Sequence, residues 1–193
     1  MEIVVVSGLP RSGTSLMMSA LEAGGVELLT DGVRGADVDN PRGYFEVEQM
    51  KTLDADAGWL AGARGKAVKI ISHWLDRLPP EHRYRVLFMR RDLGEVLESQ
   101  ARMLVHRGGP RPAPDPELAA ELKRHLEATA RLLRERACFE FLDVRHRALV
   151  QRPRAELERV ARFLGRELDV AAMCARVDPA LYRVRGSDGG EFL

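Results

Sequence analysis

Apolar positions fall into short continuous runs separated by longer stretches with helical spacing. Residues 2–7 (EIVVVS) form a β-branched run that ends at a glycine, which is typical of a buried strand. Similar short runs predict further strands over 67–71, 85–89 and 139–144.

The stretches between these runs have the apolar periodicity of helices. Helices are expected over 14–23, about 93–104 and 153–164, with a longer amphipathic helix whose inward residues are Leu118, Leu122, Leu126 and Leu133. Glycine and proline mark 30–44 as a loop and 108–116 as a turn or flap. Strands alternating with helices predict an α/β fold in which a central parallel sheet is covered on both faces, giving three layers in one domain over 1–193.

Composition limits the kinds of binding partner that we expect. The 193 residues are 45% hydrophobic, enough for one core, and 30 basic side chains nearly balance 29 acidic ones. No global field favours nucleic acid or an anionic membrane surface, and no apolar run is long enough to span a bilayer. Cys138 and Cys174 are too few for a disulfide framework or a zinc site. We expect a soluble, cytoplasmic protein without nucleic-acid, membrane or metal partners.

One segment carries the spacing of a phosphate-binding loop. Residues 8–15 read GLPRSGTS, so Gly8 and Gly13 match the glycines of G-x-x-x-x-G-K-[ST], between a predicted strand and a predicted helix. Glycines let the backbone N–H groups turn inward, and the helix N-terminus adds its positive end. The fold is therefore expected to be of the P-loop nucleotide-binding type.

The departure from that motif is informative. Thr14 stands where nucleotide triphosphatases have lysine, and a cation appears three residues earlier as Arg11. Triphosphatases use the lysine and Mg²⁺ to neutralise the β- and γ-phosphates. A sulfuryl group carries less charge than a terminal phosphoryl group, so its transfer needs fewer cations and no metal. Arg11 is placed to offset charge on the bridging oxygen to a leaving phosphate.

GLPRSGTS after an apolar strand resembles the 5′-phosphosulfate-binding loop of bacterial sulfotransferases that use 3′-phosphoadenosine-5′-phosphosulfate (PAPS). The resemblance implies that Arg11 takes the place of the catalytic lysine or arginine. The implied donor-binding residues of the loop are Pro10, Arg11, Ser12, Gly13, Thr14 and Ser15, of which the last four contact the 5′-phosphate.

The family's second signature binds the 3′-phosphate with an arginine at a strand end and a serine eight residues later. Arg91 and Ser99 have that spacing after the run RVLFM. Eight helical residues rise about 12 Å, so both reach one phosphate only if Arg91 extends along the helix. Arg90 competes for the role, because a shift of one position exchanges the two arginines.

Two further segments resemble the same family. Residues 40–46 (NPRGYFE) resemble a segment of bacterial sulfotransferases near the acceptor site, and 153–165 resembles part of their C-terminal half. A third, 183–186 (RVRG), is similar to a basic 3′-phosphate loop of animal cytosolic enzymes.

The base that accepts the acceptor's proton has two candidates. In cytosolic enzymes a lysine precedes the catalytic histidine by two residues, and counting back from Arg91 places Lys69 at the lysine and Ile71 at the histidine. His73 lies two residues further on and reaches the site if the chain turns after Ile71; otherwise it is an ordinary hydrogen-bonded histidine. Glu46 is the alternative, since some sulfotransferases use a carboxylate.

These features favour transfer of a sulfuryl group from PAPS to a hydroxyl or amine of a small-molecule or glycan acceptor, with release of PAP and without a metal. A Mg²⁺-dependent P-loop kinase or NTPase is the first alternative. A nucleotide-binding module of the same fold without catalytic activity is the second, because the histidine is out of place. The sequence leaves open the acceptor, the base, the oligomeric state and whether activity is retained.

Overall fold

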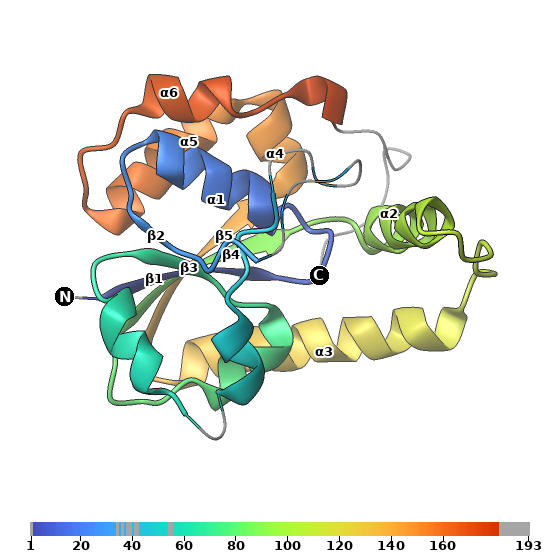
Figure 1. The fold of residues 1–193 in the computed structure, drawn as a ribbon, viewed down its shortest axis with the longest axis horizontal. Coiled ribbons are helices and arrows are strands. Elements are labelled where there is room, and N and C mark those ends of the chain that lie inside the picture. The colour runs from blue at the N-terminus through green and yellow to red at the C-terminus, as the bar shows by residue number, and fades with distance from the viewer. Residues whose placement is uncertain are drawn as a thin grey trace.

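The structure, a computed structural model, describes residues 2–33, 35, 37, 40, 43–53 and 56–181. Its centre is a five-stranded sheet with the order β2–β3–β1–β4–β5, in which every strand pair is parallel (Figure 1). The strands are β1 (Ile3–Gly8), β2 (Leu28–Leu29), β3 (Ala67–Lys69), β4 (Tyr84–Arg90) and β5 (Phe139–Arg145). This sheet, with helices on both faces, confirms the predicted three-layer α/β fold.

Strand β1 shows why the sheet needs two covering layers. All six of its residues are buried, and successive side chains point to opposite faces. Val4 and Val6 belong to one hydrophobic cluster, and Ile3 and Val5 belong to the other. A strand that is apolar on both sides must be covered on both sides.

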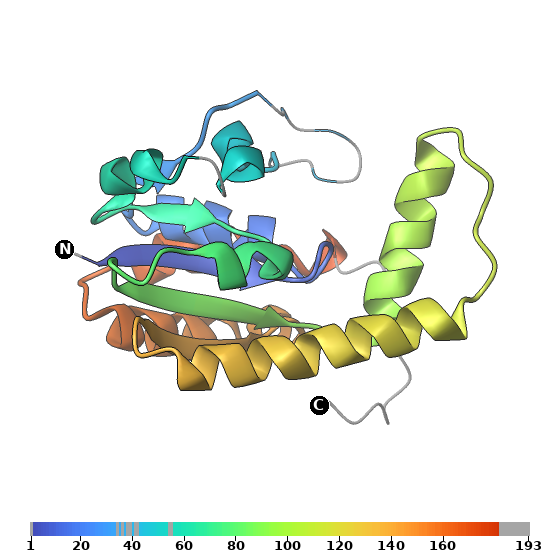
Figure 2. The same ribbon diagram turned by 90° about the horizontal axis from the view of Figure 1, so that it is seen from below.

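Each face has its own set of helices (Figures 1 and 2). One face packs against α1 (Thr14–Ala23), α4 (His146–Gln151), α5 (Pro153–Leu164) and α6 (Val170–Ala175). The other packs against the 3-10 helices η1 (Glu48–Thr52), η2 (Gly58–Ala63) and η3 (Ser72–Arg77) and the long α3 (Pro116–Glu135). Helix α2 (Leu93–His106) precedes α3, and η4 (Pro179–Leu181) ends the described chain.

The inward orientation predicted for Leu118 is wrong. Leu118 is 36% exposed, whereas Leu133 on the same helix is 1% exposed. Figure 2 shows the reason: α3 is longer than the sheet it covers, and its first turns extend beyond the sheet toward α2. Leu126 lies between these two residues and is partly buried against the hydrophobic cluster that contains Ile3 and Val5.

The strand order fixes where a ligand site belongs. The chain leaves β1 toward β2 and β3 on one side, and it leaves β4 toward β5 on the other. In open parallel sheets the crevice outside the carboxyl ends of two such strands is the usual binding site. The segments that follow β1 and β4 therefore frame the candidate site.

No helix in the described part of the chain is both long and apolar enough to cross a bilayer.

Candidate functional site

The loop after β1 has the backbone of an anion-binding turn. Gly8, Arg11 and Gly13 have φ values of 146°, 71° and 102°, so three of its residues adopt conformations that L side chains disfavour. The Ser12 N–H donates to the Leu9 carbonyl over 3.1 Å and closes the turn on itself. Its amide is thereby used within the loop.

The amides that face outward belong to the start of α1. Gly13 is the N-cap, and no described side chain caps the helix there. The first N–H groups of a helix have no intrahelical acceptor, so those of Thr14 and Ser15 are available to an anion. The first turn carries no acidic side chain that would repel one. The predicted loop residues thus form a positive helix N-terminus.

Arg11 forms hydrogen bonds with Ser99 of α2 and with Arg91, which precedes that helix. Its Nε donates to Ser99 Oγ over 3.1 Å, and its carbonyl accepts a bond from Arg91 Nη1 at 2.9 Å. Arg91 Nε also pairs with Glu95 Oε2 at 3.0 Å, and the side chains of that pair are only 9% and 4% exposed. The structure therefore brings Arg91 and Ser99 to the loop, although each contacts Arg11 rather than the other.

The two adjacent arginines point different ways. Arg90 Nε pairs with Asp143 Oδ1 of β5 at 2.8 Å, and its guanidinium lies 4.8 Å from the Phe88 ring centroid. Arg91, the first residue beyond β4, turns toward the loop instead. Arg91 is thus the candidate that bonds the backbone of Arg11 in the loop.

Lys69 joins three segments at the start of α1. Its buried ammonium donates to the Tyr44 carbonyl at 2.9 Å and to Ser15 Oγ at 3.3 Å, and it lies 3.4 Å from Glu46 Oε1. Two of the predicted catalytic residues, Lys69 and Glu46, thus meet beside a predicted phosphate-binding serine. Phe45, between Tyr44 and Glu46, has a φ of 53°.

His73 has a different environment. Strand β3 ends at Lys69 and η3 begins at Ser72, so the chain turns before His73. The exposed His73 ring stacks on His125 of α3, with centroids 3.9 Å apart and planes 7° from parallel. Ser72 Oγ lies 2.8 Å from His125 Nε2. Burial, and then the charge of His73, lower the pKa of His125. The stack places His73 against α3.

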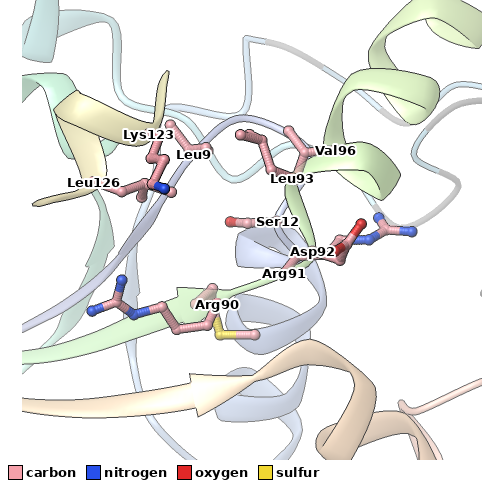
Figure 3. Close-up of a pocket in the computed structure, with 10 residues that line it drawn as sticks. Leu9, Ser12, Arg90, Arg91, Asp92, Leu93, Val96, Lys123 and Leu126 are labelled. Atoms are coloured by element: carbon pink, nitrogen blue, oxygen red, sulfur yellow. The ribbon is translucent and has the colours of Figure 1, made fainter. Parts of the chain in front are cut away.

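A cavity of about 230 Å³ lies beside the loop (Figure 3). Its walls come from the loop after β1, from the end of β4 and the residues that follow it, and from α2 and α3, at the crevice that the strand order indicates. The lining residues are Leu9, Ser12, Met89, Arg90, Arg91, Asp92, Leu93, Val96, Lys123 and Leu126.

Two solved structures of sulfotransferase domains superpose on this chain. The sulfotransferase domain of the Synechococcus PCC 7002 olefin synthase superposes with a TM-score of 0.59 at 18% identity, covering 98% of this chain and 90% of that one. The sulfotransferase domain from the curacin biosynthetic pathway superposes with a TM-score of 0.51 at 15% sequence identity, covering 98% of this chain and 93% of that one. The chain has the sulfotransferase-domain fold. At these identities the likeness shows the fold alone, and no family model or curated protein sequence matches the chain.

Within this sulfotransferase-domain fold, His146 is a site residue that the sequence did not reveal. It follows β5 directly and lies under the loop, where a Cβ on Gly13 would approach its Cδ2 to 2.6 Å. Burial, and then the charge of Arg91, lower the pKa of His146 to about 3. The imidazole is therefore neutral at ordinary pH. Its position at the carboxyl end of a strand was the available signal. Segment 183–186 and residues 41 and 42 lie outside the described residues.

Proposed function

We propose that residues 1–193 form one sulfotransferase-like domain that moves a sulfuryl group from PAPS to a hydroxyl or amine and releases PAP. The observation that carries the proposal is the convergence on Arg11. Arg91 and Ser99, which lie 80 and 88 residues further along the chain, both bond to Arg11. Together with the fold, this convergence supports one nucleotide-binding crevice formed by both expected phosphate-binding elements.

Each residue group has a role in this reaction. The amides of Thr14 and Ser15 hold the 5′-phosphate, and the Arg11 guanidinium offsets charge on the oxygen that bridges sulfur and phosphorus. Arg91 and Ser99 bind the 3′-phosphate. The acceptor oxygen or nitrogen bonds to sulfur while the bridging bond breaks, PAP leaves with the electron pair, and the acceptor proton passes to a base. Glu46 is the base that we favour, because it lies 3.4 Å from the Lys69 ammonium, which bonds Ser15 of the loop. His73, which stacks on His125, is the alternative.

A metal-dependent phosphoryl transfer finds less support in the described residues. The late strand that could supply a Mg²⁺-binding aspartate is β5, and β4 separates it from β1. The Asp143 carboxylate at its end pairs with Arg90. Thr14 replaces the lysine that such enzymes need.

Thermal unfolding with nucleotides tests the donor assignment. PAP at 100 times its Kd stabilises the folded state by about 2.7 kcal/mol, which raises Tm by roughly 5–10 °C for a chain of this size. We expect this shift in EDTA, and a smaller one with AMP, which lacks the 3′-phosphate. An unchanged Tm at millimolar PAP, or a shift only with ATP and Mg²⁺, contradicts the proposal. A PAP shift without transfer to alcohols, phenols or amines indicates the non-catalytic module.

A further inference from the structure

The cavity beside the loop is mainly apolar along its length. Leu9 precedes the loop, Leu93 and Val96 come from the first turns of α2, and Leu126 comes from α3. An engineered apolar cavity of about 150 Å³ binds benzene. A volume of about 230 Å³ therefore accommodates a body of roughly ten non-hydrogen atoms.

One end of the cavity presents a hydroxyl group that lacks a partner. Ser12 is 1% exposed, and its Oγ has no hydrogen-bond partner among the described residues. Figure 3 shows that oxygen directed into the space bordered by Leu126, Lys123 and Leu93. A buried hydroxyl left unsatisfied costs about 1–3 kcal/mol, so this atom marks the place of a polar ligand group. The group lies one residue from Arg11.

The rim of the cavity is cationic. Arg90 and Arg91 line it while pairing with Asp143 and Glu95. Lys123, from α3, has no described carboxylate within ion-pair distance. The one acidic lining residue, Asp92, accepts the Glu95 N–H as the α2 cap. A ligand that reaches Lys123 therefore gains most if that end is an anion.

We propose that this cavity binds the acceptor, and that the acceptor is a small hydroxy acid. Its alcohol or phenol hydroxyl bonds to Ser12 Oγ, its apolar body fills the space among Leu93, Val96 and Leu126, and its carboxylate pairs with Lys123. The inference rests on the proposed function, because the hydroxyl beside Ser12 is the group that attacks sulfur. Its oxygen bonds to sulfur as PAP leaves with the electron pair, and its proton passes to the base.

Calorimetric titration of the protein with saturating PAP tests the acceptor class. The probes are 4-hydroxybenzoate and 6-hydroxyhexanoate, each beside its neutral amide, which has the same shape. We expect each acid that binds to do so at least tenfold more tightly than its amide. Lys123→Met should remove that preference, whereas Lys51→Met, which changes an exposed lysine in η1, should keep it. Val96→Phe should weaken acid and amide alike by filling the cavity.

The outcomes separate the two proposals. If PAP raises Tm but neither acid binds, or the amides bind as well as the acids, the hydroxy-acid assignment is overturned and the donor assignment stands. A preference that survives in Lys123→Met also overturns it. If the acids bind and PAP does not, both proposals fall, because the cavity is then no acceptor site. Melting curves of each variant exclude unfolding as the cause of lost binding.

Discussion

Lowering the pH should destabilise the protein through His146. This side chain is 7% exposed and its pKa is lowered to about 3, first by burial and then by the charge of Arg91, with Glu95 opposing. In the unfolded chain a histidine titrates near 6.5. Below that pH the unfolded state binds a proton at His146 that the folded state does not bind until about pH 3. The contribution of His146 to stability is thus complete above pH 6.5 and is lost progressively as the pH falls toward 3.

The magnitude follows from the interval between the two pKa values. At pH 5, about 1.5 units below the unfolded value, the loss is about 2 kcal/mol. Urea unfolding at pH 7 and pH 5 measures it, with His146→Gln as the variant that cannot titrate. We expect the free energy of unfolding of the variant to fall by about 2 kcal/mol less than that of the unchanged protein. His106→Gln, at an exposed position on α2, should follow the unchanged protein. Equal losses in His146→Gln and the unchanged protein would refute the reasoning.

Three further substitutions test the loop and Arg91, which bonds to it. Gly13→Ala should lower PAP affinity at least tenfold, because its Cβ meets His146 in a backbone with φ of 102°. Gly25→Ala is the control, because its φ of 91° imposes a similar backbone strain while an added Cβ would meet no atom within 4 Å. Equal PAP affinities in the two variants would contradict the binding of PAP by the loop. Arg11→Ala should mainly lower kcat. Arg91→Ala should mainly weaken PAP binding and also destabilise the fold by about 3–5 kcal/mol, because it removes an ion-pair partner of buried Glu95. Steady-state kinetics and melting curves distinguish these roles, and equal effects of both on KM alone contradict them.

Much of the fold followed from local patterns. The bounds of α1 were predictable because Gly13 and Gly24 stop the helical pattern on either side. The two-residue β2 and the short 3-10 helices are too brief to show a period, and they form because they cover one face of the sheet. The error at Leu118 has the same origin: periodicity identifies the apolar stripe of a helix but not how far the underlying sheet extends.

The site was predictable where it is contiguous in sequence. Spacing alone located the loop at 8–15, and resemblance to a family added Arg91 and Ser99. Their common contact with Arg11 is tertiary, and no local pattern carries it. The same holds for the stacking of His73 on His125, a contact between η3 and α3. Counting residues back from Arg91 could not predict the position of His73.

Backbone strain links the two halves of the site. Arg11 and Phe45 are the only non-glycine residues with positive φ in the described part of the chain, and both border the start of α1. In each case a cation bonds a carbonyl of the strained segment: Arg91 bonds that of Arg11 itself, and the buried Lys69 bonds that of Tyr44, which precedes Phe45. Strained conformations of about 1–3 kcal/mol persist only where surrounding contacts determine them. These contacts occupy both carbonyl oxygens, and the Tyr44 carbonyl also accepts from Ser15 Oγ in the first turn of α1. Because the strained backbone is already held in place, we expect donor binding to require little rearrangement of the loop.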